Sequence, residues 1–145
     1  MPEVADHRRP EVERELGCEG SEVDRPGRPA QGQAAGEPDV LVSKSVNSAV
    51  YGDPDLRVWL DERGIRDLVI CGIQTNMCVE TTARMAGNLG YGVTVALDAT
   101  RTFDLAGEVA GLGTVSRTAA ELMADTALVL QQGGFARIVR TVDLL

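Results

Sequence analysis

The feature that most limits the fold of this chain is a regular alternation of apolar runs and helical segments after residue 38. Four short runs rich in Val, Leu and Ile are typical of strands, and they lie at 39–43, 67–71, 93–97 and 136–140. Three segments with helical spacing or helix-capping residues separate them, at 53–64, 76–89 and 116–132. One helix per connection predicts a parallel α/β sheet with right-handed crossovers.

Local signals place the ends of these elements. Asp53 followed by Pro54 is typical of a helix start, and Ser116 is expected to cap the last helix. The run 67–71 is nearly all apolar, which is typical of a strand covered on both faces. The Gly- and Thr-rich stretch between residues 97 and 114 is predicted to be a loop.

Residues 1–38 differ from the rest, because they hold five of the six prolines and few large apolar side chains. Such a composition buries too little to offset its ordering entropy, so we expect an irregular or disordered segment before a domain spanning 39–145.

The formal charge of −8 argues against nucleic-acid binding and against attraction to anionic membranes. No apolar run approaches the ~18 residues of a membrane span, and the N-terminus does not resemble a secretory signal. We therefore expect a cytoplasmic protein whose three cysteines are thiols.

Candidate functional residues cluster where parallel strands end, since ligands bind at the carboxyl edge of such sheets. Cys78 is expected in the first turn of a helix, where unpaired N–H groups and the helix dipole favour a thiolate. Lys44, the only lysine, follows a predicted strand at the same edge. The alternatives are a buried structural cysteine and a surface lysine, and Cys71, inside an apolar run, fits the structural role well.

Several segments resemble the isochorismatase-like cysteine hydrolase family over roughly Pro38–Leu145. They are Lys44–Gly52, Cys71–Arg84, Gly90–Tyr91, Asp98–Ala99 and Gly133–Arg137. The resemblance implies a three-layer α/β/α fold with a parallel sheet. It also implies hydrolysis of an amide-type C–N bond in a small molecule through a cysteine thioester.

The resemblance further implies roles for particular residues. Cys78 matches the family's nucleophile and Lys44 its catalytic lysine. The Ile73–Gln74 bond matches a cis peptide, which directs the N–H groups of Gln74 and Cys78 toward an oxyanion. A cysteine at position 78 indicates the amidase branch rather than the isochorismatases that cleave a vinyl ether. The Asp and His cluster by which nicotinamidases bind a metal is missing, so we expect no metal and no other cofactor.

One part of the family pattern is missing as well. Relatives begin with a strand ending in Asp-x-Gln, whose Asp is the third catalytic residue, and no such strand precedes Lys44 here. We therefore interpret the chain as a member lacking its first strand or strands. Asp98 is the best internal substitute, although a capping role is expected more strongly for it, and Glu80 is expected to point elsewhere.

This loss leaves other functions open. An exposed strand edge favours self-association, so a homo-oligomer is possible. The chain can alternatively be a catalytically impaired remnant or a partner of a full-length relative. A third hypothesis is a redox-sensing thiol protein, in which Cys78 forms a disulfide with Cys71 or Cys18.

Overall fold

The computed structural model describes residues 38–145, and Val40–Leu145 form one compact unit. The expectation that residues 1–38 are irregular, and any role of Cys18, fall outside the described residues except for Pro38.

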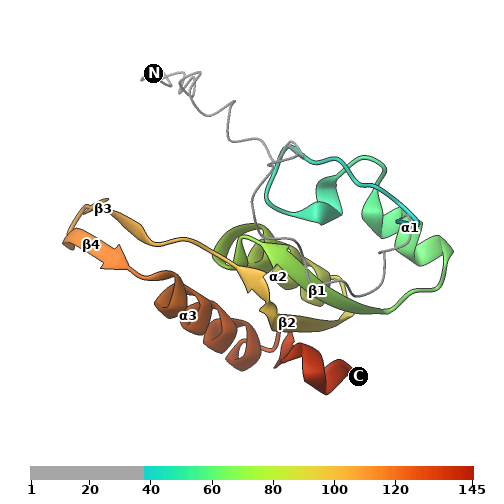
Figure 1. Ribbon diagram of the computed structural model, residues 1–145. Coiled ribbons are helices and arrows are strands. Elements are labelled where there is room, and N and C mark those ends of the chain that lie inside the picture. Colours follow the sequence, from blue (N-terminus) through green and yellow to red (C-terminus); the bar gives the residue numbers. More distant parts are fainter. Residues whose placement is uncertain (1–37) are drawn as a thin grey trace, which may run out of the picture. The chain divides into compact units, whose positions relative to one another are not determined.

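Three parallel strands form the central sheet of the unit, in the order β1-β2-β5 (Figure 1). They are β1 (Asp67–Ile73), β2 (Gly92–Arg101) and β5 (Arg137–Val139). The register aligns Ile70 of β1 with Val95 of β2, and Val95 with Ile138 of β5. The predicted parallel α/β sheet is therefore confirmed, and these strands correspond to three of the four apolar runs.

Helices connect the strands and form the core together with strand β2. They are α1 (Leu56–Glu62), α2 (Glu80–Asn88) and α3 (Ala119–Gln132), with shorter turns η2 (Ala49–Tyr51), η3 (Thr75–Val79) and η4 (Thr141–Leu144). The core cluster consists of Leu60, Val79, Ala83, Ala86, Tyr91, Val93, Val95, Leu130 and Ala136. Of the helices described, none has the length and apolar character needed to cross a membrane.

The run 39–43 does not form a strand of the sheet, contrary to expectation. Within residues 38–145, Ser43 alone of this run pairs with another segment, through two backbone hydrogen bonds with Asp53 of 2.9 and 2.7 Å. The run therefore folds back on its own loop, where Gly52 packs closely against Val42. Because Asp53 is used in this bridge, the following helix starts later, at Leu56, and Asp55 caps it by accepting from the Val58 N–H.

The stretch predicted as a loop contains a β-hairpin. Strand β2 continues to Arg101, and β3 (Leu105–Val109) then pairs antiparallel with β4 (Gly113–Arg117). Gly111 and Gly113 have positive φ angles of 84° and 74°, which glycine adopts without steric cost. Ser116 lies within β4, so Thr118 rather than Ser116 caps α3.

Strand β1 is covered on one face only, among the described residues. Leu68 and Ile70 pack against the core cluster, whereas Val69, Cys71 and Ile73 are exposed. Successive side chains of a strand point to opposite faces, so these three residues belong to the face away from the core. The expectations that both faces are covered and that Cys71 is buried are therefore wrong.

Candidate active site

The candidate site begins at the turn between β1 and α2. Gly72 has a φ angle of 118°, and the peptide bond between Ile73 and Gln74 is cis. The Gln74 carbonyl then accepts hydrogen bonds from the N–H groups of Met77 and Val79, at 3.2 and 3.1 Å. These bonds start the π-helical turn η3, which leads directly into α2 and contains Cys78.

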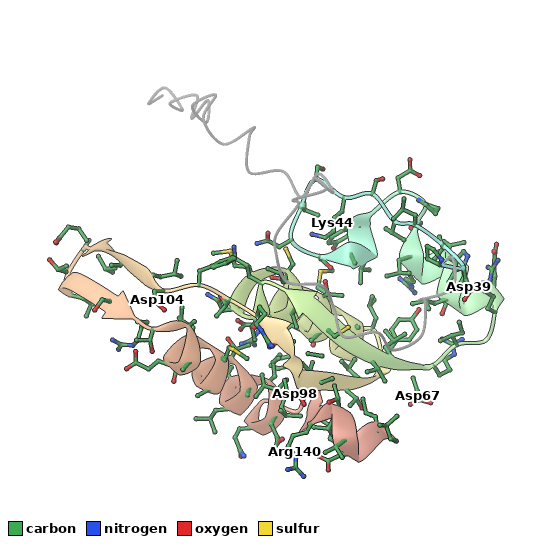
Figure 2. All side chains as sticks on the ribbon, in the orientation of Figure 1. Asp39, Lys44, Asp67, Asp98, Asp104 and Arg140 are labelled. Atoms are coloured by element: carbon green, nitrogen blue, oxygen red, sulfur yellow. The ribbon has the colours of Figure 1, made fainter. Side chains whose placement is uncertain are left out.

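Lys44 and Cys78, 34 residues apart in the sequence, meet at this turn. The Lys44 Nζ donates a hydrogen bond to the Cys78 Sγ at 3.3 Å and another to the Val46 carbonyl at 3.1 Å. Both side chains are half-buried. Figure 2 shows Lys44 on the coil segment before η2, which α2 holds through a 3.0 Å bond from the Ala49 N–H to the Thr82 Oγ1. Lys44 therefore reaches the sulfur from a coil and not from the end of a sheet strand.

Buried threonines join the turn to β2, a feature that the sequence analysis missed. The Thr75 hydroxyl donates to the Thr100 Oγ1 at 2.9 Å, and Thr100 donates to the Leu97 carbonyl at 2.8 Å. Thr75 and Thr100 are fully buried, and Thr102 bonds to Asn76. The available signal was the spacing of Thr100 at the end of β2 and Thr102 just after it, which places both side chains on one side of an extended segment.

Asp98, the suggested substitute for the family's third catalytic residue, has another role. Its carboxylate accepts hydrogen bonds from the Thr141 N–H and hydroxyl, both at 2.8 Å. These bonds, led by that of the hydroxyl, hold the pKa of Asp98 below its ordinary value. In Figure 2 Asp98 lies well away from Lys44, so it caps the C-terminal turn η4 instead of joining the site.

Glu80 also points away from the sulfur. Its carboxylate accepts from the Arg84 guanidinium at 2.9 and 2.8 Å and lies 3.5 Å from the Thr126 hydroxyl. Across residues 38–145 no hydrogen bond or ion pair joins a carboxylate to Lys44 or Cys78. Nor do three His, Cys, Asp or Glu side chains gather there as a metal site would require.

Comparison with models of known families shows which family this chain belongs to. The family model of the isochorismatase domain matches residues 6–127. The chain belongs to the isochorismatase family. The match begins well before Pro38. Pro38 is the residue from which the resemblance can be recognised in the sequence itself.

Individual relatives of this isochorismatase-family chain include named amide hydrolases. It is 40% identical over 74 residues to nicotinamidase 3 of Arabidopsis thaliana, covering 51% of this chain and 36% of that protein. It is 45% identical over 62 residues to the ureidoacrylate amidohydrolase RutB of Stutzerimonas stutzeri, covering 43% and 25%.

A solved structure shares the fold as well as the family. An isochorismatase-family protein of Chromobacterium violaceum superposes with a TM-score of 0.66 at 31% identity, over 88% of this chain and 65% of that one. The matched region thus spans about a third or less of these two curated relatives and just under two thirds of this structure.

Proposed function

We propose that the protein hydrolyses an amide-type C–N bond of a small molecule, with Cys78 as nucleophile. The observation that carries this proposal is the 3.3 Å hydrogen bond from the Lys44 Nζ to the Cys78 Sγ. An ammonium group that donates to sulfur stabilises negative charge there, and a thiolate is the nucleophilic form of cysteine.

In the proposed reaction the Cys78 sulfur attacks the carbonyl carbon, and a C–S bond forms as the carbonyl electrons move to oxygen. The N–H groups of Gln74 and Cys78 are the proposed donors to this oxyanion. Collapse of the intermediate breaks the C–N bond, and the amine leaves with a proton that the Lys44 ammonium can give. Water then hydrolyses the thioester, returns a proton to Lys44, and releases a carboxylate.

Two observations support an amide as the substrate class. Nicotinamidase and ureidoacrylate amidohydrolase are relatives whose names denote amide hydrolysis. In addition, the candidate nucleophile is a thiol in a helical turn, which suits acyl transfer.

The test compares two cysteine variants on a panel of small primary amides and ureido acids. Cys78→Ala should lower hydrolysis by on the order of 10³-fold or more, because no nucleophile remains. Cys71→Ala is the matched control, because Cys71 is an exposed thiol of β1 with no role in the proposal. Intact-mass analysis should detect an acyl adduct on Cys78. Activity that survives Cys78→Ala would falsify the mechanism.

A second candidate, favoured by the lack of a carboxylate contact to Lys44 or Cys78 in the described residues, is a member impaired in hydrolysis. Acyl transfer by cysteine normally uses a base that accepts and returns the proton. In that case Cys78 forms an adduct once with a reactive thioester or ester, but no turnover follows. A burst of product equal to the protein concentration, without a steady state, distinguishes this outcome from full activity.

A further inference from the structure

The Cys78 sulfur has a second polar neighbour, which the reaction proposed above does not use. The Asn47 Oδ1 lies 3.9 Å from the Cys78 Sγ, in a contact to which the thiol donates. The Lys44 Nζ approaches the same sulfur to 3.3 Å. The candidate nucleophile therefore has both a cation and a neutral side-chain amide beside it.

The coil that carries Lys44 also fixes the position of Asn47. The next residue, Ser48, caps the turn η2 and is 2% exposed. The Ala49 N–H then donates to the Thr82 Oγ1 of α2 at 3.0 Å. Asn47 itself is exposed, so its amide is held beside the sulfur at a surface that a small molecule can reach.

We propose that Asn47 is a further catalytic residue, whose Oδ1 accepts a hydrogen bond from an N–H of the leaving group. This inference rests on the amide hydrolysis proposed above. Once the Cys78 sulfur has bonded to the carbonyl carbon, the sulfur and the leaving nitrogen are attached to the same carbon. A side chain that contacts the sulfur is then within hydrogen-bonding reach of that nitrogen.

Asn47 and Lys44 act on different parts of the leaving nitrogen in this step. The Asn47 Oδ1 accepts from the N–H, while the nitrogen lone pair takes a proton from the Lys44 ammonium. The C–N bond then breaks with its electron pair on the amine, and the electrons of the oxyanion re-form the carbonyl of the thioester. Asn47 neither gains nor loses a proton, because its side-chain amide acts only through hydrogen bonds.

This role defines the substrate class more narrowly than an amide-type bond does. The leaving nitrogen must carry hydrogen, as it does in primary amides, monosubstituted amides and ureido groups. An ester or a disubstituted amide has no such hydrogen, so it leaves the acceptor oxygen without its partner. Sites built to bond a particular N–H discriminate against analogues that lack it. Among the described residues, Asn47 supplies the one side-chain oxygen in hydrogen-bond contact with the sulfur.

The test compares probes that differ at the leaving atom. Para-nitro-trifluoroacetanilide carries a leaving N–H, whereas its N-methyl derivative and the ester para-nitrophenyl acetate do not. Each probe releases a coloured product when Cys78 is acylated, even if no turnover follows. Subtracting the rate of Cys78→Ala leaves the part that is due to the sulfur. We define the N–H selectivity as the anilide rate divided by the rate of either probe without the N–H.

Three variants of the coil are measured with these probes. Asn47→Leu removes the acceptor at similar side-chain size and should lower the N–H selectivity about fivefold, as expected for one lost neutral hydrogen bond. Asn47→Asp keeps an acceptor oxygen and should retain the selectivity. Ser45→Ala, a change at an exposed residue of the same coil, is the control and should also retain it. A merely structural role of Asn47 would slow all probes equally and leave the selectivity unchanged.

The outcomes separate this inference from the proposed function. Unchanged selectivity in Asn47→Leu, with Cys78 still acylated by the anilide, would overturn the role of Asn47 and leave amide hydrolysis standing. Acylation of the wild type by the ester alone would overturn both the role of Asn47 and the amide substrate class. If no probe acylates Cys78, the proposed function fails and this inference fails with it.

Discussion

At the scale of single residues, the contact between Lys44 and Cys78 decides the chemistry that we propose. One charged hydrogen bond contributes about 1.5–3 kcal/mol when it is shielded from water, and the half-exposed setting of this pair reduces that value. The contact is long range in sequence, so it depends on the coil 44–48 being held against α2. The Ala49 to Thr82 hydrogen bond performs that task.

Lys44→Met should therefore slow alkylation of Cys78. We expect a reduction on the order of tenfold near neutral pH, because tenfold corresponds to about 1.4 kcal/mol. Peptide mass analysis after timed exposure to iodoacetamide measures the rate. Cys71 in the same sample is the internal control, since Lys44 does not contact it among the described residues. Equal slowing of both thiols would instead indicate a general change in the fold.

Ionisation of Asp98 makes the free energy of unfolding depend on pH in the acid range. Its pKa lies below the ordinary value of 3.8, chiefly because of the Thr141 hydroxyl and then the Thr141 N–H. The unfolded chain therefore binds this proton more readily than the folded chain does. The stabilisation is present above the ordinary pKa and is lost as pH falls through the lowered one.

As the pH falls from about 5 to about 3, the free energy of unfolding should decrease less for Asp98→Asn than for the wild type. Urea unfolding across that range measures the difference. Thr141→Val is the matched variant, because it removes the hydroxyl donor and should flatten the pH dependence in the same direction. A wild type and Asp98→Asn with parallel pH profiles would contradict this role for Asp98.

At the scale of elements, the start of α3 shows how a neighbouring element changes a local signal. Ser116 and Thr118 are both suitable caps by composition. The pairing of Ser116 with Ala106 places Ser116 in β4, so the helix begins after Thr118. Thr118 and Glu121 then form a reciprocal capping box, in which the Thr118 N–H donates to Glu121 at 2.8 Å.

Thr118→Ala should lower the free energy of unfolding by about 1 kcal/mol, the usual cost of losing a cap. Ser116→Ala is the control and should change it by less than about 0.5 kcal/mol, because Ser116 is an exposed strand residue. Chemical denaturation of both variants measures these changes. A larger loss of stability in Ser116→Ala than in Thr118→Ala would instead indicate that Ser116 caps the helix.

The hairpin and the run 39–43 show why element type was harder to predict than element position. The β1, β2 and β5 runs are apolar and have partners in the sheet, so the sequence pattern is sufficient. The run 39–43 is also apolar, but its pairing is limited to Ser43 with Asp53 in the described residues. A strand exists only where another strand satisfies its backbone hydrogen bonds, and a local sequence pattern does not identify that partner strand.

At the scale of the whole unit, the core cluster is built by residues of strand β2 together with residues of helices from separate parts of the chain. Leu130 of α3 is 1% exposed within this cluster, whereas Leu128, two residues earlier, is 60% exposed. The two leucines share a helix and differ in their packing. Substituting each leucine in turn therefore separates the effect of burial from the effect of helix propensity.

Leu130→Ala should destabilise the fold by about 2–5 kcal/mol, because it removes buried methyl groups and leaves a cavity. Leu128→Ala should change the free energy of unfolding by less than about 0.5 kcal/mol. Thermal or urea unfolding measures both. Equal effects would mean that the face of α3 carrying Leu128 is also buried, which a partner copy could cause.

The sequence by itself determined the parallel α/β class, three sheet strands and the family, because these follow from local periodicity and from motifs that are continuous in the chain. It also singled out Lys44 and Cys78 as candidate site residues. Only the tertiary structure decided which groups meet: the Lys44 contact with Cys78, the threonines behind Thr75, and the bond of Asp98 to Thr141. Such contacts join residues more than twenty positions apart, and their geometry depends on how packed elements fix the backbone between them.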